Sequence, residues 1–334
     1  MDKFQKLVLV DGSGYIFRAY YALPYMNRAD GMPVNAIFGF TNMLLKLLED
    51  TQKDYGGNVG VAVIFDAARE TFRNEIYKEY KANRADAPED LIPQFEIIKK
   101  IPSIFNLPSI ESLGFEADDL IASYCEEAIK KSINVSIVSS DKDLMQLLRN
   151  NITMFDPIKK KEITETDVLN KFGVNSTKVV DVQALAGDTS DNVPGVPGIG
   201  VKTAAHLINE FGNLENLLLN LKNIKQNKRR ESLINNKNLA LISKKLVTLK
   251  DDVPLPYKIE NLKFKPLDVA KLLDFLDEME FSRIKSLVIS KFGYPNGKSL
   301  KNDVINEEVK DNNVNQINSK SISIKREKYQ LVQS

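Results

Sequence analysis

Residues 6–17, KLVLVDGSGYIF, indicate the fold class of this chain. Lys6–Val10 is a short apolar run with the length of a buried strand, and the run stops at Asp11. A second run of this kind, Val59–Phe65 (VGVAVIF), also stops at an acid, Asp66. An acid directly after a buried strand is therefore a repeated feature of the first half of the chain.

A third strand and the helical stretches between the strands complete this pattern. Asn134–Val138 (NVSIV) is followed closely by Asp141, and Ala36–Leu48 has apolar residues at helical spacing. Strands that alternate with helices are typical of a parallel sheet with helices on both faces. The sequence therefore predicts an α/β fold with a central, mostly parallel sheet. Because functional groups collect beyond the carboxyl ends of such strands, we expect these acids to meet there.

The chain is predicted to contain two folded parts followed by a tail. Residues 1–165 form the α/β domain, and residues 166–292, where helical patterns replace strand patterns, form a helical subdomain. Residues 293–322 are polar and rich in Asn, which is typical of a flexible linker. Residues 323–334 alternate apolar and polar side chains as a strand does, and we expect them to begin a following, truncated domain.

The composition excludes several classes of protein. No apolar run approaches the roughly 18 residues of a membrane span, and the N-terminus lacks the pattern of a secretory signal. Cys125 is the only cysteine, so no internal disulfide can form, and a reducing cytoplasm is the expected location. His206 is the only histidine, so a Ser–His–Asp triad has no support. We expect a cytoplasmic, monomeric protein with no membrane partner.

Acids that follow strands, open helices or lie in turns are candidates for one metal site. They are Asp11, Asp66, Glu116, Asp118, Asp119, Asp141, Asp143, Asp188 and Asp191. So many carboxylates in one pocket would repel one another unless cations neutralised them. Oxygen ligands without thiolates or imidazoles indicate Mg²⁺ or Mn²⁺, and two such ions about 4 Å apart suit in-line hydrolysis of a phosphodiester. Each acid alone could instead cap a helix or stabilise a turn.

Residues 191–205, DNVPGVPGIGVKTAA, predict a phosphate-binding turn before a helix. Glycines let the backbone approach a ligand closely, and the amides at the helix start would point at an anion. Such a site holds a DNA phosphate without recognising the base sequence. We expect Gly198, Gly200 and Lys202 to contact the phosphate, and carbonyls around Val196 and Ile199 to offer a site for K⁺. A tight turn between packed helices is the alternative.

Basic and aromatic residues are mixed in the segment between Asp66 and Glu116. Arg73, Tyr80, Lys81 and Arg84 have the chemistry of single-strand binding, with charges for phosphates and rings for bases. An ordinary amphipathic surface helix is the alternative. We also place Arg18 near the scissile phosphate. The net charge is only +1, yet nine basic residues and one acid lie in residues 221–250. If the acids gather in a site and the bases along its rim, the local fields are large although the sum is small. An ordinary solvated helical surface is the alternative for this basic run.

The motifs together resemble those of the 5′-nuclease, or flap endonuclease, superfamily, most closely the N-terminal 5′→3′ exonuclease domain of bacterial DNA polymerase I. The matching motifs are LVDGSGYIFRAYYAL, VIFDA, FRNEIYKEYKANR, GFEADDLIAS, SSDKDLMQL and GDTSDNVPGVPGIGVKTA, in the family's order across residues 5–290. The resemblance implies a PIN-like sheet domain, a helical arch at about residues 69–102 and a helix-hairpin-helix subdomain that binds DNA.

The resemblance also implies roles for the site residues. One ion would be held mainly by Asp11, Asp66, Glu116 and Asp118, and the second mainly by Asp119, Asp141, Asp143, Asp188 and Asp191. Tyr80, Lys81 and Arg84 would meet the 5′ end from the arch. The implied reaction removes 5′ nucleotides or flaps from nicked, gapped or flapped DNA in primer removal, replication and repair, near the bacterial nucleoid. REKYQLV, at 326–332, would be the first strand of the domain that follows in polymerase I.

Two other functions fit parts of the sequence. A non-catalytic DNA-junction binder would keep the hairpin and the basic residues, although the complete set of acids argues against it. A small-molecule phosphohydrolase would use Asp141 and Asp143 as an Asp-x-Asp pair and would give the hairpin no function.

Overall fold

The computed structural model describes residues 4–294 of the chain. The described residues up to Gly293 form one compact unit. The predicted linker lies outside the described residues from 295 onward, and so does the strand predicted at 323–334. The domain boundary at residue 165 remains a prediction.

A six-stranded sheet in the order β3-β2-β1-β4-β5-β6 forms the centre of the first half. The strands are β1 (Lys6–Asp11), β2 (Val59–Ile64), β3 (Ser109–Ile110), β4 (Asn134–Val138), β5 (Ile152–Asp156) and β6 (Lys161–Ile163). Neighbouring strands are parallel except for β6, which pairs antiparallel with β5. The predicted mostly parallel sheet is confirmed, whereas β3, β5 and β6 were not expected.

The register of the sheet brings the carboxyl ends of β1, β2 and β4 level with one another. Val10 lies opposite Val63 of β2 and Val138 of β4, so the three strands end within a few residues of one another. The strand order also reverses at β1, because β2 follows it on one side and β4 on the other. Ligands of open parallel sheets bind beyond the carboxyl ends of the strands at such a reversal.

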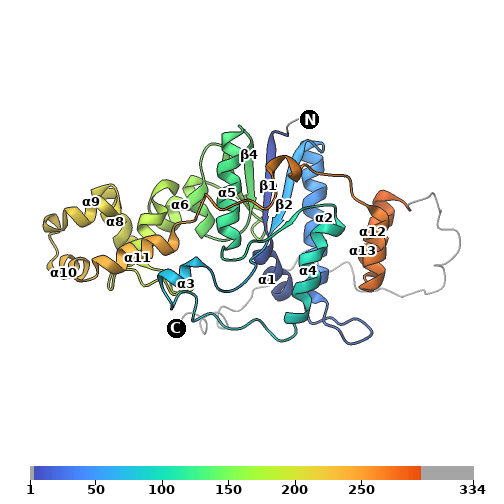
Figure 1. Cartoon of the computed structure of the whole chain (residues 1–334), viewed down its shortest axis with the longest axis horizontal. Helices are drawn as coiled ribbons and strands as arrows, with labels where there is room; N and C mark the ends of the chain where they lie inside the picture. The colour runs from blue at the N-terminus through green and yellow to red at the C-terminus, as the bar shows by residue number, and fades with distance from the viewer. Residues whose placement is uncertain (1–3, 295–334) are drawn as a thin grey trace, which may run out of the picture. The chain divides into compact units, whose positions relative to one another are not determined.

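Helices cover both faces of this sheet. They are α1 (Gly12–Ala22), α2 (Asn35–Tyr55), α4 (Ile92–Ile104) and α5 (Ala117–Lys130). Helix α2 packs against α1 and α4, and α5 packs against β1 and β4. Figure 1 shows β1 and β2 lying between α5 on one side and α2 on the other. The predicted helix at 36–48 is confirmed as part of α2, whose buried face includes Ile37, Phe40 and Leu44.

The rest of the unit is mainly helical, as expected. The α-helices are α6 (Glu165–Phe172), α7 (Val179–Ala186), α8 (Val201–Phe211), α9 (Leu214–Leu219), α10 (Asn227–Asn235), α11 (Lys237–Val247), α12 (Val269–Glu278) and α13 (Ser282–Phe292). Short 3₁₀ helices are η1 (Asp143–Leu147), η2 (Ser176–Lys178), η3 (Leu221–Asn223) and η4 (Ile259–Leu262). Helices α7 and α8 pack together, and residues 187–200, which contain the predicted hairpin, join them.

The segment predicted as a helical arch is mostly not helical. It contains the five-residue helix α3 (Phe72–Ile76), then turns and extended chain over residues 77–91, and then α4. Lys81 has a φ of 57°, which no helix contains, and a proline stands near the start of α4. The apolar face of α4 packs on α2 instead of standing free. The prediction of a helical arch is therefore wrong for residues 77–91.

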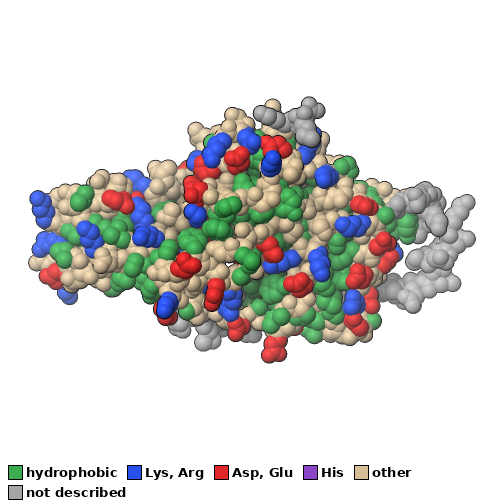
Figure 2. Space-filling model, viewed as in Figure 1, with side chains coloured by type: hydrophobic (Ala, Val, Ile, Leu, Met, Phe, Trp, Pro, Cys, Tyr) green, Lys and Arg blue, Asp and Glu red, His purple; other side chains and the backbone are tan. Residues whose placement is uncertain are grey.

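Two surface properties bear on function. No helix in the described range, residues 4–294, is both long enough and apolar enough to span a membrane. Basic side chains gather over α9 and α10 in Figure 2. Exposed lysines of this region are Lys222, Lys225, Lys228 and Lys237.

Candidate metal and nucleic-acid site

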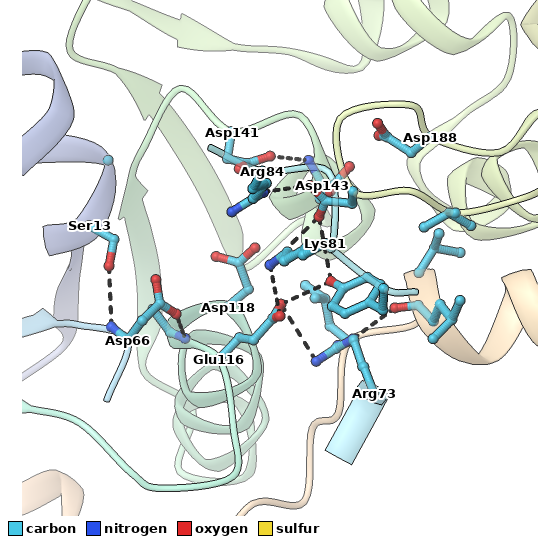
Figure 3. Close-up of a pocket in the computed structure, with 18 of the residues that line it drawn as sticks. Ser13, Asp66, Arg73, Lys81, Arg84, Glu116, Asp118, Asp141, Asp143 and Asp188 are labelled. Atoms are coloured by element: carbon cyan, nitrogen blue, oxygen red, sulfur yellow. Dashed lines mark hydrogen bonds and ion pairs between the residues drawn. The ribbon is translucent and has the colours of Figure 1, made fainter. Parts of the chain in front are cut away.

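A cavity of about 180 Å³ lies beyond the carboxyl ends of β1, β2 and β4. Eight of the nine predicted acids line it, namely Asp11, Asp66, Glu116, Asp118, Asp141, Asp143, Asp188 and Asp191. They come from three strand ends, the start of α5 and the loop between α7 and α8. In Figure 3 Asp118 lies in the middle, between Asp66 and Lys81. The predicted convergence of these acids is therefore present in the structure.

Asp11 both caps a helix and faces the cavity. Its Oδ1 accepts a hydrogen bond from the Gly14 amide at 2.8 Å at the start of α1. Its Oδ2 accepts one from the Ser139 hydroxyl at 2.7 Å, and that hydroxyl accepts one from the Asp141 amide at 3.0 Å. Capping and site formation are thus not alternatives here, since one carboxylate does both.

Asp66 is held in a similar way between β2 and α5. Its backbone amide donates to the Ser13 hydroxyl at 3.2 Å, and its Oδ1 accepts from the Ala117 amide at 2.8 Å (Figure 3). These bonds tie the ends of neighbouring elements together, so the acids are placed by the backbone and not only by their own side chains.

Basic side chains of the chain itself pair with acids at one side of the cavity. Lys81 Nζ lies 2.7 Å from Glu116 Oε1 and 3.6 Å from Asp191 Oδ2. Arg84 also pairs with Asp191. Burial lowers the pKa of Lys81, but the charges of Glu116 and Asp191 raise it by more. The pKa is therefore above its ordinary value, and this ammonium stays charged. The acids are therefore partly neutralised by basic side chains of the chain itself, which the sequence did not predict.

Lys142 makes a third such pair, with Asp188. Burial opposes ionisation of Asp188, but the hydrogen bond from Lys142 holds the pKa of this carboxyl below its ordinary value. Lys142 stands between two predicted ligands in the sequence, and its own role was not foreseen.

Other acids of the cavity form no ion pair with a lysine or arginine among residues 4–294, and their ionisation is opposed. Burial raises the pKa of Asp11 to about 6. Burial and the charge of Asp141 raise the pKa of Asp143 to about 7. Burial raises the pKa of Asp118 well above its ordinary value, and the charges of Asp141 and Asp11 add to the effect. A cation that entered the cavity would reverse these shifts.

The donor chemistry fits hard divalent cations, although the ligands are not yet gathered. No three Asp, Glu, His or Cys side chains between residues 4 and 294 are already arranged to hold a metal ion. The described residues that line the cavity nevertheless include eight carboxylates, the ligands that Mg²⁺ and Mn²⁺ prefer, and no His or Cys. None of the described residues donates a hydrogen bond to the Asp118 carboxylate, which leaves its oxygens available as ligands.

Asp119 and Arg73 are not where the sequence analysis expected them. Asp119 was predicted to bind metal, but it is fully buried and does not line the cavity. Arg73 was predicted to contact DNA, but it borders the cavity with only 1% of its surface exposed, and its guanidinium pairs with Asp119. The two residues, which the sequence analysis assigned to DNA and to metal, form a buried ion pair with each other.

Tyr80 and Arg18 also differ from expectation. The Tyr80 ring is 5% exposed and packs against Val193, Leu246 and Val247, so it offers no face to a base in this conformation. Its hydroxyl donates at 3.3 Å to Glu116. Arg18 is partly buried on α1 and does not line the cavity.

The glycine hairpin has the exposure that its predicted role requires. Gly198 has a φ of +79°, and a Cβ at Gly198 or Gly200 would meet no atom within 4 Å. Lys202 is exposed beside them. The side chains of Val196 and Ile199 are buried, and the Val196 carbonyl accepts a hydrogen bond from the Ile199 amide at 3.0 Å. Contact with DNA and K⁺ binding remain predictions.

Sequence analysis missed the neutral residues that support the acids. Besides Ser13 and Ser139, the amide of Gln183 on α7 donates to Asp143 Oδ1 at 2.6 Å. An uncharged side chain at a strand end or within a helix carries no signal of this function. For Ser13 and Ser139, the only signal that could have indicated a role is their position close to acids in the sequence.

Two family models match the chain. A model described as 5′-3′ exonuclease, N-terminal resolvase-like domain, matches residues 6–173, and one described as 5′-3′ exonuclease, C-terminal SAM fold, matches residues 174–270. The DNA polymerase I of Rhizobium leguminosarum is 50% identical over 290 residues, which cover 85% of this chain and 28% of that protein. The 5′-3′ exonuclease of Aquifex aeolicus is 37% identical over 294 residues, which cover 88% of this chain and 99% of that protein.

Solved structures share the fold. A flap endonuclease of bacteriophage T5, in a complex with DNA and metal ions, has a TM-score of 0.61 at 23% identity, covering 86% of this chain and 100% of that one. The chain spans about a third (28–38%) of the length of the curated DNA polymerase I relatives that it matches.

Proposed function

The chain belongs to the 5′-3′ exonuclease family, and from this we propose that it is a metal-dependent nuclease that cuts the 5′-ended strand of flapped, nicked or gapped DNA. The observation that carries the proposal is the convergence of eight carboxylates on one cavity. Its setting is primer removal in DNA replication and repair, and a polymerase fused to the same polypeptide is the proposed partner.

We assign two Mg²⁺ or Mn²⁺ ions to the cavity. Asp11, Asp66, Glu116 and Asp118 would hold one ion, and Asp141, Asp143, Asp188 and Asp191 the other. When bound, the two ions would activate a water molecule and stabilise the charge that develops on the phosphate. Asp119 is left out of this set because Arg73 already occupies its carboxylate.

Lys81 and Arg84 supply the positive charge that the chain itself brings to the substrate. Both now pair with Glu116 or Asp191, acids that cations would otherwise neutralise. If those acids held cations, the ammonium and the guanidinium would be free to bind oxygens of the scissile phosphate. Arg18 does not line the cavity, so we give it no part in this step.

The duplex is held away from the cavity. The exposed backbone at Gly198 and Gly200, with Lys202 beside it, suits a phosphate of the DNA backbone. A K⁺ ion at the carbonyls of Val196 and Ile199 belongs to the same proposal. The lysines over α9 and α10 extend the basic surface along a duplex.

A 5′-labelled flap duplex incubated with Mg²⁺ or with EDTA tests this function. The nuclease predicts cleavage near the branch that EDTA abolishes. A shift of the DNA in a gel without cleavage under either condition would identify a DNA-junction binder instead. Neither cleavage nor binding would favour a hydrolase of small phosphate esters.

A further inference from the structure

Arg73 is one of the largest fully buried side chains among the described residues. A guanidinium remains charged in proteins, so burying it is unfavourable unless hydrogen bonds and an opposite charge compensate. Arg73 lies in α3, ahead of Lys81 and Arg84 in the chain. Its position therefore requires an explanation other than contact with solvent or DNA.

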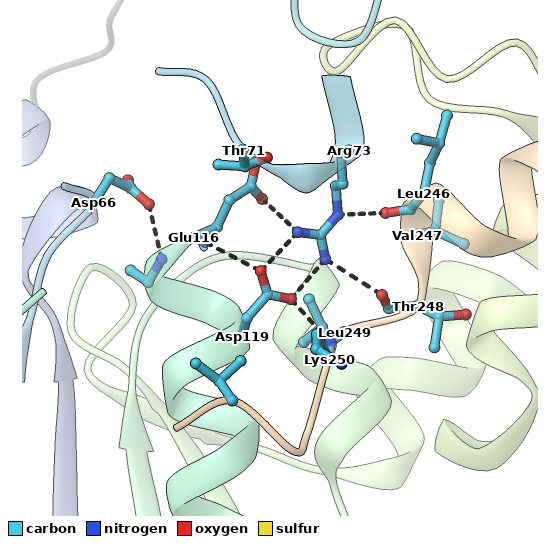
Figure 4. Close-up of polar contacts among 12 residues, drawn as sticks. Asp66, Thr71, Arg73, Glu116, Asp119, Leu246, Val247, Thr248, Leu249 and Lys250 are labelled. Carbon is cyan, nitrogen blue, oxygen red and sulfur yellow. Dashed lines mark hydrogen bonds and ion pairs between the residues drawn. The ribbon is translucent and has the colours of Figure 1, made fainter. Parts of the chain in front are cut away.

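Every nitrogen of the Arg73 guanidinium is bonded inside the protein (Figure 4). Nη1 and Nη2 donate to the two carboxylate oxygens of Asp119, each at 2.7 Å. Nε donates to the Leu246 carbonyl at 2.8 Å, and Nη2 also donates to the Thr248 carbonyl at 3.3 Å. Four of the five N–H donors are thus used inside the protein, and the remaining one, on Nη1, lies beside Glu116, whose Oε2 is 3.6 Å away.

Asp119 connects the buried Arg73 guanidinium to the backbone at the start of α5. Its Oδ2 accepts a hydrogen bond from the Glu116 backbone amide at 3.1 Å, and its Oδ1 accepts one from the Lys250 amide at 2.9 Å. Glu116 is the N-cap residue of α5 and Asp118 lies in its first turn, and both line the cavity. The Arg73–Asp119 pair thus joins α3, the start of α5 and residues 246–250.

We propose that Arg73 and Asp119 are positioning residues, whose buried pair fixes the first turn of α5 so that Glu116 and Asp118 point into the metal site. The inference rests on the proposed function, because it assumes that these two acids bind metal. Arg73 Nη1 also lies 3.6 Å from Glu116 Oε2, so the guanidinium orients that side chain directly as well. Neither Arg73 nor Asp119 touches the ions or the DNA.

The variants follow from the geometry. Arg73→Lys keeps the charge but loses the planar fork, so it cannot make both carboxylate bonds and both carbonyl bonds. Removing only one partner outright would leave a buried charge unpaired, which is strongly destabilising. Arg73→Met/Asp119→Leu removes both charges together and avoids that penalty. Arg69→Lys is the matched control, because Arg69 is an exposed arginine of the same segment that pairs only on the surface.

The experiment measures metal affinity and DNA affinity separately in the full chain. Mn²⁺ is titrated calorimetrically into each folded variant, with thermal unfolding as the check on folding. Binding of a flap duplex is measured in EDTA at several salt concentrations. We expect Arg73→Lys and the double variant to weaken Mn²⁺ binding by roughly 10- to 100-fold. Their DNA affinity and its salt dependence should match those of the wild type and of Arg69→Lys.

Two results would overturn the proposal. The first is wild-type Mn²⁺ affinity in folded Arg73→Lys, or in the double variant if Arg73→Lys does not fold. The second is weaker DNA binding with a salt slope smaller by about one, which would identify a direct phosphate contact. If the wild-type chain itself bound no Mn²⁺, the proposed function would fail as well; normal wild-type binding with unchanged variants removes only the positioning role.

Discussion

Asp118 lies at the centre of the acid cavity, with its ionisation opposed by burial and by Asp141 and Asp11. Asp118→Ala removes a proposed ligand, so cleavage of a flap duplex should fall by at least roughly 100-fold. The same change relieves repulsion, so the midpoint of thermal unfolding in EDTA should rise. Asp86→Ala, at an exposed acid, is the control and should alter neither rate nor stability. Wild-type turnover in Asp118→Ala would defeat the assignment of the site.

Lys81 is a basic residue that pairs with two of the proposed ligands, Glu116 and Asp191. Lys81→Ala should lower the rate of single-turnover cleavage by roughly 100- to 1,000-fold, because a charge that stabilises the transition state is lost. Duplex affinity measured in EDTA should fall only modestly, since the hairpin and the basic surface remain. A cleavage rate equal to that of the wild type would exclude Lys81 from the reaction.

The sequence revealed which residues are charged but not which charges pair. The acids after β1, β2 and β4 could be placed at one edge of a sheet because strand periodicity determines where each strand ends. Arg73 and Asp119 were assigned to DNA and metal, yet they pair across 46 residues of sequence. Nothing local distinguishes a charge that is exposed from one that a distant partner buries.

At the scale of elements, long periodic segments were predictable and short ones were not. The strands at β1, β2 and β4 and the helix α2 have enough apolar residues to define a period. β3 has two residues and β6 has three, too few for any pattern. Residues 77–91 adopt turns that contacts with other parts of the chain determine. The Asn83 amide, for example, donates to the carbonyl of Thr189.

The hairpin between α7 and α8 permits a test of one element. Gly198→Asp places a negative charge where a phosphate is proposed to bind, so duplex affinity should fall about equally for all base sequences. Gly57→Asp is the matched control, because Gly57 also has a positive φ, of +81°, and open space around its Cβ position. Gly57 lies just before β2, at the amino-terminal end of that strand and so away from the cavity. Gel-shift titrations on several duplexes would measure this; a loss confined to some sequences would contradict a backbone contact.

At the scale of the whole molecule, the cavity should make stability depend on pH. Asp11 and Asp143 have pKa values raised to about 6 and about 7 from an ordinary 3.8, so the native state binds protons that the unfolded chain has released. The free energy of unfolding in EDTA should therefore rise as the pH falls from 8 to 6, by at most about 1.4 kcal/mol per pH unit for each group.

Saturating Mg²⁺ should reverse that dependence. A bound cation favours both ionised carboxylates, so the stabilisation by Mg²⁺ should be largest at pH 8 and smaller at pH 6. Denaturant unfolding at pH 6, 7 and 8, with Mg²⁺ and with EDTA, measures both effects. Asp143→Asn should flatten the curve in EDTA. Stability in EDTA that decreased from pH 8 to pH 6 would contradict the raised pKa values.

The hydrogen bonds that surround the Asp119 carboxylate have a consequence for folding during synthesis on the ribosome. Its carboxylate is completed by the amide of Lys250, 131 residues further along. At roughly 5–20 residues per second, ribosomes need about 7 to 26 s to synthesise that interval. Until then the first turn of α5 lacks its closing contacts. If the proposed site depends on this contact, the growing chain should be unable to cut DNA until residues up to Lys250, just beyond α11, have left the ribosome.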